Sequence, residues 1–528
     1  MFHPRRTLRA LLLPLAAGLA LTTLPARSAS AASTLTNGGF ESGGTGTATP
    51  AGWSTYSAAG QNSASFTEAG GHGGGYRLSH WAPTAYKVET YQYLSGLTNG
   101  TYKLTAWVRS GGGQKAAYLA LKNCGGAEQR TDLPVSASGW LRIVVPVDVT
   151  RNQCTISINS DANAGNWINV DDLTFTPGTS GTSIHGADIS SLPKSEAKGG
   201  LYRTASGTNG DAVTILKNAG MNYARLKVWV DPADGYNNKA RVLAMAKRVK
   251  AAGMKLLICL LYTSDFHYSD FWADPGRQDK PAAWAGHSYS RLRTDVYDHT
   301  YDVLNALKSQ GTTADMVQVG NEINGGMLWN EGSTGNWSQL AGLLDSGYDA
   351  VKAVDSSTTV ALHLAKGGDL SGTRWWFDRA VANGVKFDAI GLSYYGYWHG
   401  SLHDFQTTLD DAASRYGKPV FVAETAYPFR LDSEDGHEEI IDTTGELVAG
   451  YPATTAGQRR WMNDVTSIVE AVPDGRGLGV FYWEATWTAV SGNGWDPTDA
   501  SSGNGWENQA LFGYDDRALS SMAWFRHR

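Results

Sequence analysis

The chain has 528 residues, of which 42% are hydrophobic and 11% aromatic, and it contains only 3 cysteines. This length predicts more than one domain and excludes a small disulfide-stapled fold. Glycine accounts for 62 residues and charged side chains for 18%, a balance typical of loop-rich extracellular proteins rather than of coiled coils. The net charge of −6 gives no indication of nucleic-acid binding.

The first 31 residues have the composition of an export signal. Arg5 and Arg6 precede an apolar run over 11–24, and the small residues at 29–31 supply a cleavage site. The apolar run is shorter than the ~20 residues that span a bilayer, which argues against a membrane anchor. We therefore expect a secreted, extracellular protein whose mature chain begins near residue 32, by either the general or the twin-arginine export route.

Residues 32–176 show the pattern of an all-β domain. Short runs of alternating apolar and polar residues, such as 101–108 and 141–147, are separated by glycine and asparagine. That pattern predicts a jelly-roll β-sandwich. Residues 177–183 contain glycine, serine, threonine and proline but no large apolar side chain, so we expect a flexible linker there.

From residue 184 to residue 528, apolar β-branched runs alternate with helical patterns, which predicts parallel strands joined by crossover helices. The helical patterns cover, for example, 212–219, 239–252, 300–309 and 339–354. Eight strand candidates occur, at 186–190, 223–229, 255–258, 316–322, 358–364, 389–395, 419–427 and 478–487. The predicted fold is α/β, a (β/α)8 TIM barrel preceded by the β-sandwich domain.

Two carboxylates stand at predicted strand ends, where barrel enzymes hold their catalytic groups. Glu322 closes the fourth strand candidate after Asn321, and Glu424 closes the seventh. Glycoside hydrolysis needs two such carboxyl groups, one to protonate the leaving oxygen and one to attack the anomeric carbon. Capping or salt-bridged glutamates are the alternative reading of this spacing alone.

Other polar and aromatic residues lie at predicted strand ends, a mixture that suits the apolar faces and hydroxyl edges of sugars. They are Arg225, His267, His363, Tyr394, Tyr395, His399 and Trp483. Each alone is compatible with a place in the core. The sequence has no His-Glu-x-x-His motif, cysteine cluster, phosphate-binding loop or Gly-x-Ser-x-Gly elbow, so zinc, nucleotide and serine-nucleophile chemistry lack support.

Several motifs in residues 184–528 carry a family resemblance. The block Asp-Phe-His-Tyr-Ser-Asp-Phe-Trp at 265–272 is the most specific of them, whereas Asn-Glu at 321–322 is shared by a large superfamily. Further pieces are Gly-Ala-Asp-Ile-Ser-Ser-Leu at 186–192, Arg-Leu-Lys-Val-Trp at 225–229, Ser-Tyr-Tyr at 393–395, Trp-His-Gly at 398–400, Ala-Glu-Thr at 423–425 and Asn-Gln-Ala-Leu-Phe at 508–512. With these, the region resembles the endo-β-1,4-galactanases of glycoside hydrolase family 53.

The resemblance implies roles for particular residues. Glu322 would be the acid/base and Glu424 the nucleophile of a double displacement, which requires carboxyl groups about 5 to 5.5 Å apart. Arg225 would bind the nucleophile and keep it ionised. Asn321 would bind the sugar 2-hydroxyl, and Trp483 would form the floor of the site. The remaining substrate-site candidates are His267 and one of the two tyrosines, which would orient Glu424, and His399.

The chain departs from the family pattern at 259–264, where six residues separate Ile258 from Asp265. Family members run directly from the strand into the Asp-Phe-His-Tyr block, so this run is either a true insertion or foreign sequence joined during assembly. Cysteine usage singles out the same run, because a secreted chain favours paired cysteines and Cys259 is the odd one beside Cys124 and Cys154.

The N-terminal domain resembles jelly-roll carbohydrate-binding modules, most closely those of family 61. By that analogy Glu41 with Asp171 or Asp172 would meet at the two ends of the domain and hold a structural calcium ion. Trp81 and Tyr91 are the candidate sugar platforms, and Trp53 is a candidate for either a platform or the core. Asp435 lies in an acidic loop after the seventh strand, a second candidate calcium site or simply a solvated loop.

Together these observations predict a secreted, monomeric, retaining endo-β-1,4-galactanase that needs no cofactor for its chemistry, with (arabino)galactan as its partner. The two glutamates do not indicate which sugar the substrate contains, so a related enzyme acting on mannan or glucan is an alternative. A galactan-binding protein whose barrel lost activity through residues 259–264 is the alternative from another class.

Overall fold

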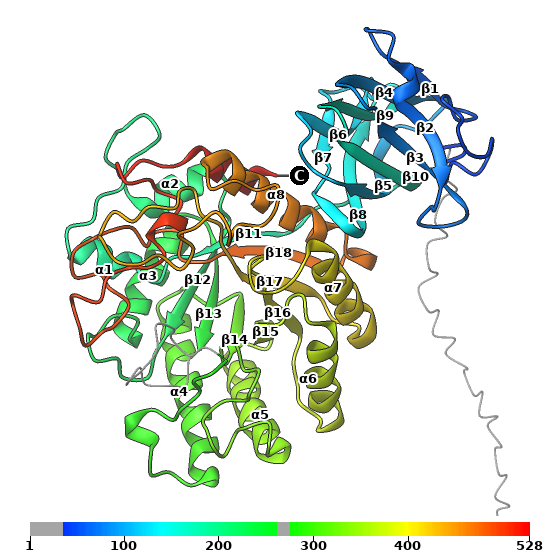
Figure 1. Ribbon diagram of the computed structural model, residues 1–528. Coiled ribbons are helices and arrows are strands. Elements are labelled where there is room, and N and C mark those ends of the chain that lie inside the picture. Colours follow the sequence, from blue (N-terminus) through cyan, green and yellow to red (C-terminus); the bar gives the residue numbers. More distant parts are fainter. Residues whose placement is uncertain (1–34, 261–274, 528) are drawn as a thin grey trace, which may run out of the picture.

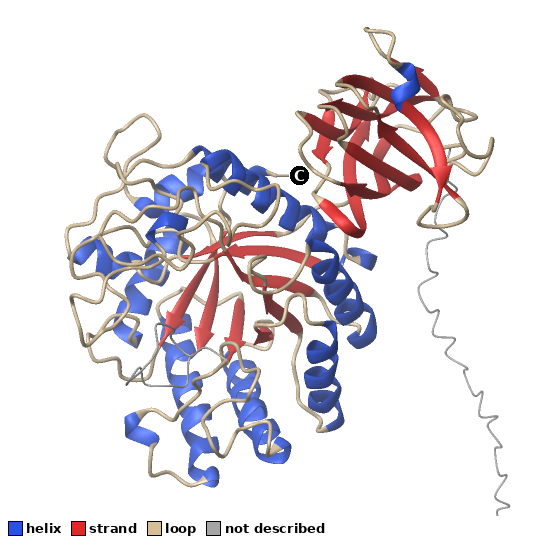
Figure 2. Cartoon of the chain, viewed as in Figure 1, coloured by secondary structure: helices blue, strands red, loops and turns tan. Residues whose placement is uncertain are grey.

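The computed structural model describes residues 35–260 and 275–527. Within them the chain forms a β-sandwich followed by a closed barrel, which confirms the predicted fold class (Figures 1 and 2). The expected export signal lies outside the described residues. Among the described residues, none of the helices is long and apolar enough to cross a membrane.

The sandwich consists of two antiparallel five-stranded sheets. One has the order β1 (Ser54–Tyr56), β4 (Tyr86–Ser95), β9 (Gln153–Ala162), β6 (Ala116–Lys122) and β7 (Gln129–Asp132); the other has the order β2 (Ser65–Ala69), β3 (Tyr76–Trp81), β10 (Trp167–Pro177), β5 (Gly100–Ser110) and β8 (Ser136–Val149). Alternate residues of β4 and β5 are buried, because successive side chains of a strand point to opposite faces. The predicted pair, Cys124 and Cys154, forms a disulfide within this domain.

The barrel closes in chain order, so each strand pairs with its neighbours in the sequence. The strands are β11 (Ile184–Asp188), β12 (Tyr223–Val228), β13 (Lys255–Leu260), β14 (Met316–Val319), β15 (Thr359–Leu364), β16 (Ala389–Ser393), β17 (Val420–Thr425) and β18 (Gly477–Tyr482). Their described residues are almost all buried, as expected for parallel strands covered on both faces. A central layer that includes Tyr223, Phe421 and Phe481 fills the interior.

Helices surround the barrel, and most begin at a side-chain cap. They are α1 (Leu192–Ala197), α2 (Ala212–Ala219), α3 (Lys239–Ala251), α4 (Tyr289–Ser309), α5 (Trp337–Val354), α6 (Leu370–Ala382), α7 (Leu402–Tyr416) and α8 (Thr455–Glu470). Ser401 and Asp404 form a capping box at the start of α7. Short 3₁₀ turns occupy Asn62–Ala64, Ala282–Trp284, Pro473–Gly475, Glu507–Gln509 and Ser520–Arg526.

Several element boundaries differ from the sequence prediction; the eighth strand, for example, ends at Tyr482 rather than at 487. Two of these differences bear on the site. The fourth strand ends at Val319 rather than at 322, because Gly320 and Glu322 have φ values of +78° and +48°, which extended strands do not adopt. The third strand continues past 258 through Leu260, and Cys259 pairs with Lys227 and Gln318 on the flanking strands. The first two residues of the interposed run are therefore part of the barrel wall, and 261–264 lie outside the described residues.

The sandwich contacts the barrel through β8, which lies beside α7 and α8 (Figure 1). Arg142 on β8 binds both carboxylate oxygens of Asp410 at 2.9 and 2.8 Å. The side chain of Gln406 accepts from the backbone N–H of Arg142 and donates to its carbonyl, both at 2.7 Å. Because these bonds involve part-buried groups on regular elements, they hold the two domains in one orientation.

Candidate active site

The strands β11, β12 and β17 bring together a buried ion cluster that contains Glu424. Arg225 lies at the centre, with Nη1 2.8 Å from Asp188 Oδ2 and Nη2 2.8 Å from Glu424 Oε1. The side chains of Arg225 and Asp188 are fully buried and that of Glu424 is 5% exposed. Burial raises the pKa of the Glu424 carboxyl to about 7; the guanidinium of Arg225 opposes that rise and the charge of Asp188 adds to it. The predicted contact between Arg225 and Glu424 is present.

The structure distinguishes the two adjacent tyrosines. Tyr395 donates its hydroxyl to Glu424 Oε2 at 3.3 Å, so it orients this carboxylate. Tyr394 instead donates to the carbonyl of Gly400 and stacks on Phe405, which places it in the wall behind the site. His399 accepts a hydrogen bond from the backbone N–H of Tyr395, and burial lowers its pKa to about 4.

Glu322 follows β14 at a strained turn. Its φ of +48° is unusual for a residue with a side chain, and strain of this kind costs of order 1–3 kcal/mol and is typical of functional sites. Ser393, at the end of β16, donates to Glu322 Oε1 at 2.6 Å. Asn321 accepts from Arg225 Nη2 at 2.7 Å through its Oδ1. Residues at β12, β14 and β16 thus meet around the two glutamates.

Aromatic rings surround this carboxylate cluster. Trp483, directly after β18, packs over the side-chain amine of Lys227 at 4.4 Å and over the guanidinium of Arg225 at 5.5 Å. Trp506 lies edge-on to Trp483, and the 49% exposed Trp398 lies edge-on to Trp506. These rings offer the flat apolar surfaces on which sugar rings stack.

Several functional neighbours were not assigned a role from the sequence. Asp188, Lys227 and Glu484 form buried ion pairs, Asp188 with Arg225 and Lys227 with Glu484. The sequence could have indicated Lys227, because it stands two residues after Arg225 and therefore on the same face of the strand. A charged side chain in an apolar strand needs a buried partner. Cys259 is the free cysteine of the described residues, and burial raises its pKa to about 12. The predicted site residue His267 lies outside the described residues.

The carboxylates expected to bind calcium are arranged differently. Within residues 35–260 and 275–527, no group of three or more His, Cys, Asp or Glu side chains could hold a metal ion. Glu41 accepts from the N–H groups of Gly75 and Tyr76, and Asp171 accepts from its neighbour Asp172 and from His72. The Oδ1 of Asp435 accepts from the backbone of His437. Asp172, the remaining candidate, lies with Oδ2 2.7 Å from Nδ1 of His72. The described residues therefore give the expected calcium sites no support.

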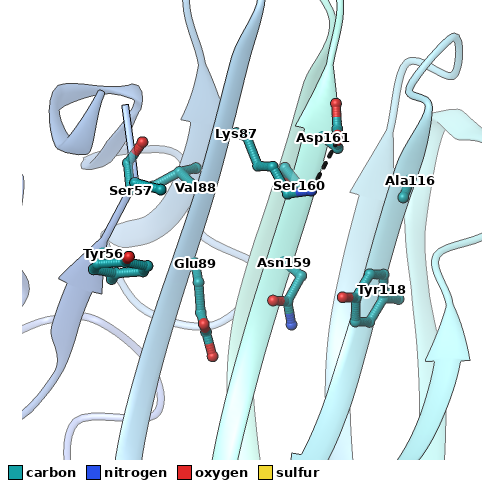
Figure 3. Close-up of a pocket in the computed structure, with 11 residues that line it drawn as sticks. Tyr56, Ser57, Lys87, Val88, Glu89, Ala116, Tyr118, Asn159, Ser160 and Asp161 are labelled. Carbon is teal, nitrogen blue, oxygen red and sulfur yellow. Dashed lines mark ion pairs between the residues drawn. The ribbon is translucent and has the colours of Figure 1, made fainter. Parts of the chain in front are cut away.

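The two predicted sugar platforms of the sandwich lie on different sheets. Trp81 ends β3, is 43% exposed and lines a hollow of about 490 Å³ with Trp167 and Arg109. Tyr91 lies on β4 of the other sheet, whose outer face holds a smaller pocket flanked by Tyr56 and Tyr118 (Figure 3). Trp53 is 5% exposed and packs on Phe40 at 5.3 Å, so it belongs to the core.

A closed barrel of eight parallel strands, with two glutamates after β14 and in β17 beside a buried arginine and a row of aromatic rings that ends at the exposed Trp398, defines the class: a (β/α)8 glycoside hydrolase. The model of glycosyl hydrolase family 53 matches residues 184–525. The chain therefore belongs to this family.

Named relatives and solved structures agree with that membership. The chain is 34% identical over 378 residues to an endo-β-1,4-galactanase of Bacillus subtilis, covering 65% of this chain and 85% of the relative. It is 33% identical over 352 residues to an arabinogalactan endo-β-1,4-galactanase of Thermothelomyces thermophilus, covering 65% and 99%. The family 53 catalytic domain of Ignisphaera aggregans superposes with a TM-score of 0.62 at 40% identity, covering 66% of this chain and 97% of that one.

Proposed function

We propose that the protein is a retaining endo-β-1,4-galactanase that hydrolyses internal β-1,4-galactosidic bonds in the (arabino)galactan side chains of pectin. The observation that carries the proposal is the contact of Glu424 with Arg225 on one oxygen and Tyr395 on the other. A carboxylate held in this way is oriented as a nucleophile rather than as a proton donor. The family 53 relatives are named as endo-β-1,4-galactanases, and these names supply the sugar and the linkage.

The chemistry proceeds in two displacements. Glu424 attacks the anomeric carbon while Glu322 gives its proton to the departing glycosidic oxygen, so the glycosidic bond breaks as the glycosyl–Glu424 ester forms. Glu322, now a carboxylate, takes a proton from water, whose oxygen attacks the same carbon and releases Glu424. Arg225 holds the negative charge of Glu424 before and after the ester exists, and Asn321 binds the 2-hydroxyl beside the reacting carbon.

The sandwich serves as a carbohydrate-binding module for the same polymer. Trp81 and Trp167 present indole rings to the hollow, and Glu68, Arg109 and Asn169 bring hydrogen-bonding groups to it. This combination of apolar and polar groups suits a saccharide, whereas Tyr91 occupies a separate face. Because β8 is fixed to α7, the module keeps the bound polymer at a constant distance from the barrel, which raises its local concentration.

The protein is secreted as a monomer. The sequence of residues 1–31 supports export. Amino-terminal sequencing of the extracellular protein tests secretion, and light scattering tests the oligomeric state. We expect the protein in the culture medium to begin near residue 32. Retention of the first 31 residues would contradict the proposed export, and a mass of two chains would contradict the monomer.

The activity is tested by incubating the purified mature chain with linear β-1,4-galactan, β-1,3-galactan, mannan and cellulose and measuring new reducing ends. We expect hydrolysis of β-1,4-galactan alone, and its loss in Glu322→Gln and Glu424→Gln. Hydrolysis of mannan or cellulose instead would assign the same machinery to another polymer. Binding of galactan with no turnover in the wild-type chain would favour a binding protein.

A further inference from the structure

A chain of buried hydrogen bonds runs from the barrel interior to the proposed acid/base. Ser393 Oγ lies 2.6 Å from Glu322 Oε1 and 2.8 Å from His363 Nε2. The other ring nitrogen of His363, Nδ1, lies 2.9 Å from Gln318 Nε2. Gln318, His363 and Ser393 are fully buried on three neighbouring strands, β14, β15 and β16, so solvent does not compete for these bonds.

Arg225 fixes the orientation of the Gln318 amide, and with it the direction of the hydrogen bond between Gln318 and His363. Its guanidinium, which can only donate, lies 3.3 Å from Gln318 Oε1 through both Nε and Nη2. The amide oxygen of Gln318 therefore faces Arg225, and its NH₂ group faces His363. Burial and the nearby charge of Arg225 lower the pKa of His363 far below its usual value, and the ring of His399 acts in the same sense, so the imidazole is neutral.

Asn321 decides which nitrogen of His363 carries the proton. Its Oδ1 lies 3.0 Å from Nδ1, and it already accepts from Arg225 Nη2 at 2.7 Å and Gln318 Nε2 at 2.9 Å. With both lone pairs of this oxygen used, a proton on Nδ1 would face a filled acceptor and the donor NH₂ of Gln318. The Nε2 group of Gln318 also lies 3.0 Å from the carbonyl oxygen of Gly320, so its two protons are shared among three acceptors. An unprotonated Nδ1 is one of these acceptors, which leaves the proton of the neutral ring on Nε2.

We propose that His363 and Ser393 are positioning residues that confine the catalytic proton of Glu322 to its Oε2 atom. The Nε2–H of His363 donates to Ser393 Oγ, so the single hydroxyl proton of Ser393 is directed to Glu322 Oε1. An oxygen that accepts this bond is the carbonyl oxygen of the protonated acid, and the transferable proton is on the other oxygen. After proton transfer, the same hydroxyl stabilises the carboxylate.

This inference rests on the proposed role of Glu322 as acid/base, and its test separates the two. We compare β-1,4-galactan with a dinitrophenyl β-1,4-galactobioside, whose leaving group needs no protonation. Glu322→Gln should lose activity on galactan but keep bond cleavage in the activated substrate, seen as a burst of dinitrophenol. Loss of that burst would overturn the acid role itself, and with it the proposed function.

Ser393→Ala tests the positioning role. General acid catalysis contributes ~10²–10⁴-fold, so a misplaced proton should lower kcat/KM on galactan at least about tenfold while cleavage of the activated substrate changes less than about threefold. Loss of a hydrogen bond to the ionised form raises a carboxyl pKa, so the alkaline limb of the kcat/KM profile should also move to higher pH. Tyr395, which interacts with both Glu322 and Glu424, and Arg225, which pairs with Glu424, stay unchanged in this variant.

Two further variants keep the test decisive if the alanine protein folds poorly. Ser393→Thr retains the hydroxyl, so kcat/KM on galactan and the position of the alkaline limb should both return to those of the wild type. His363→Met should reproduce the pH profile of Ser393→Ala. Ser346→Ala removes a buried hydroxyl on α5 that bonds the carbonyl of Gly342 and the side chain of Arg293 rather than this hydrogen-bond chain, so it is the matched control. Equal losses on both substrates, or an alkaline limb that stays in place in Ser393→Ala, would overturn the positioning role.

Discussion

Replacing Arg225 with methionine removes the cation that stabilises the proposed nucleophile. The guanidinium lies 2.8 Å from Glu424 and 2.8 Å from Asp188, and all three side chains are buried. An opposite charge at such a distance lowers a carboxyl pKa by about 1–3 units. Without it the pKa of Glu424, which burial already raises to about 7, should rise by a similar amount, because Asp188 then repels it without compensation.

The assay is the pH profile of kcat/KM on β-1,4-galactan, whose acid limb reports the nucleophile of the free enzyme. In Arg225→Met the limb should move up by about 1–3 pH units. Asp188→Asn removes the like charge and should move it down, so the two variants give shifts of opposite sign. Breaking a buried ion pair also destabilises a protein by about 3–5 kcal/mol, so melting curves must show that each variant is folded at the assay temperature. An acid limb unchanged in both folded variants would refute this account.

Three further outcomes are expected. Arg142→Met combined with Gln406→Ala should detach β8 from α7 and increase the radius of gyration in small-angle scattering; an unchanged radius would contradict a fixed arrangement. Burial beside Glu507 raises the pKa of Glu439 to about 9, so the wild-type melting temperature should fall as pH rises from about 5 to 9, and Glu439→Gln should reduce that slope. Trp81→Ala should weaken galactan retention in affinity electrophoresis, whereas Tyr91→Ala should not; the reverse order would assign the binding face to the other sheet.

The sequence predicted the barrel because its signals are local and repeated. Apolar β-branched runs alternating with amphipathic helices identified all eight strands, and the helix over 212–219 matches α2 at both ends. Boundaries failed where the backbone leaves extended geometry, as at Glu322, since a positive φ at a non-glycine residue has no local sequence signal. The predicted linker and domain limits remain predictions, although β10 ends at Pro177 and β11 begins at Ile184.

Site residues could be predicted where polar side chains close apolar strands. They could not be predicted where a residue's role depends on its hydrogen-bond partner. Glu322, Glu424 and Arg225 stood out because polar groups closed apolar runs. The choice between the adjacent tyrosines required coordinates, because neighbouring residues at a strand end point in different directions and only Tyr395 reaches Glu424. Trp81 and Tyr91 were grouped as platforms because alternation gives the face of a strand but not the sheet to which it belongs.

The central claim is that Glu424 forms a covalent bond with the sugar. A 2-deoxy-2-fluoro galactobioside with a dinitrophenyl leaving group slows release of the enzyme-bound intermediate, so the adduct can be located by mass spectrometry of the intact chain and of its peptides. The account predicts a mass increase of one fluorinated galactobiosyl group, on the peptide that contains Glu424, and no adduct in Glu424→Gln. A label on another residue, or release of α-configured product from galactan with no adduct at all, would contradict it.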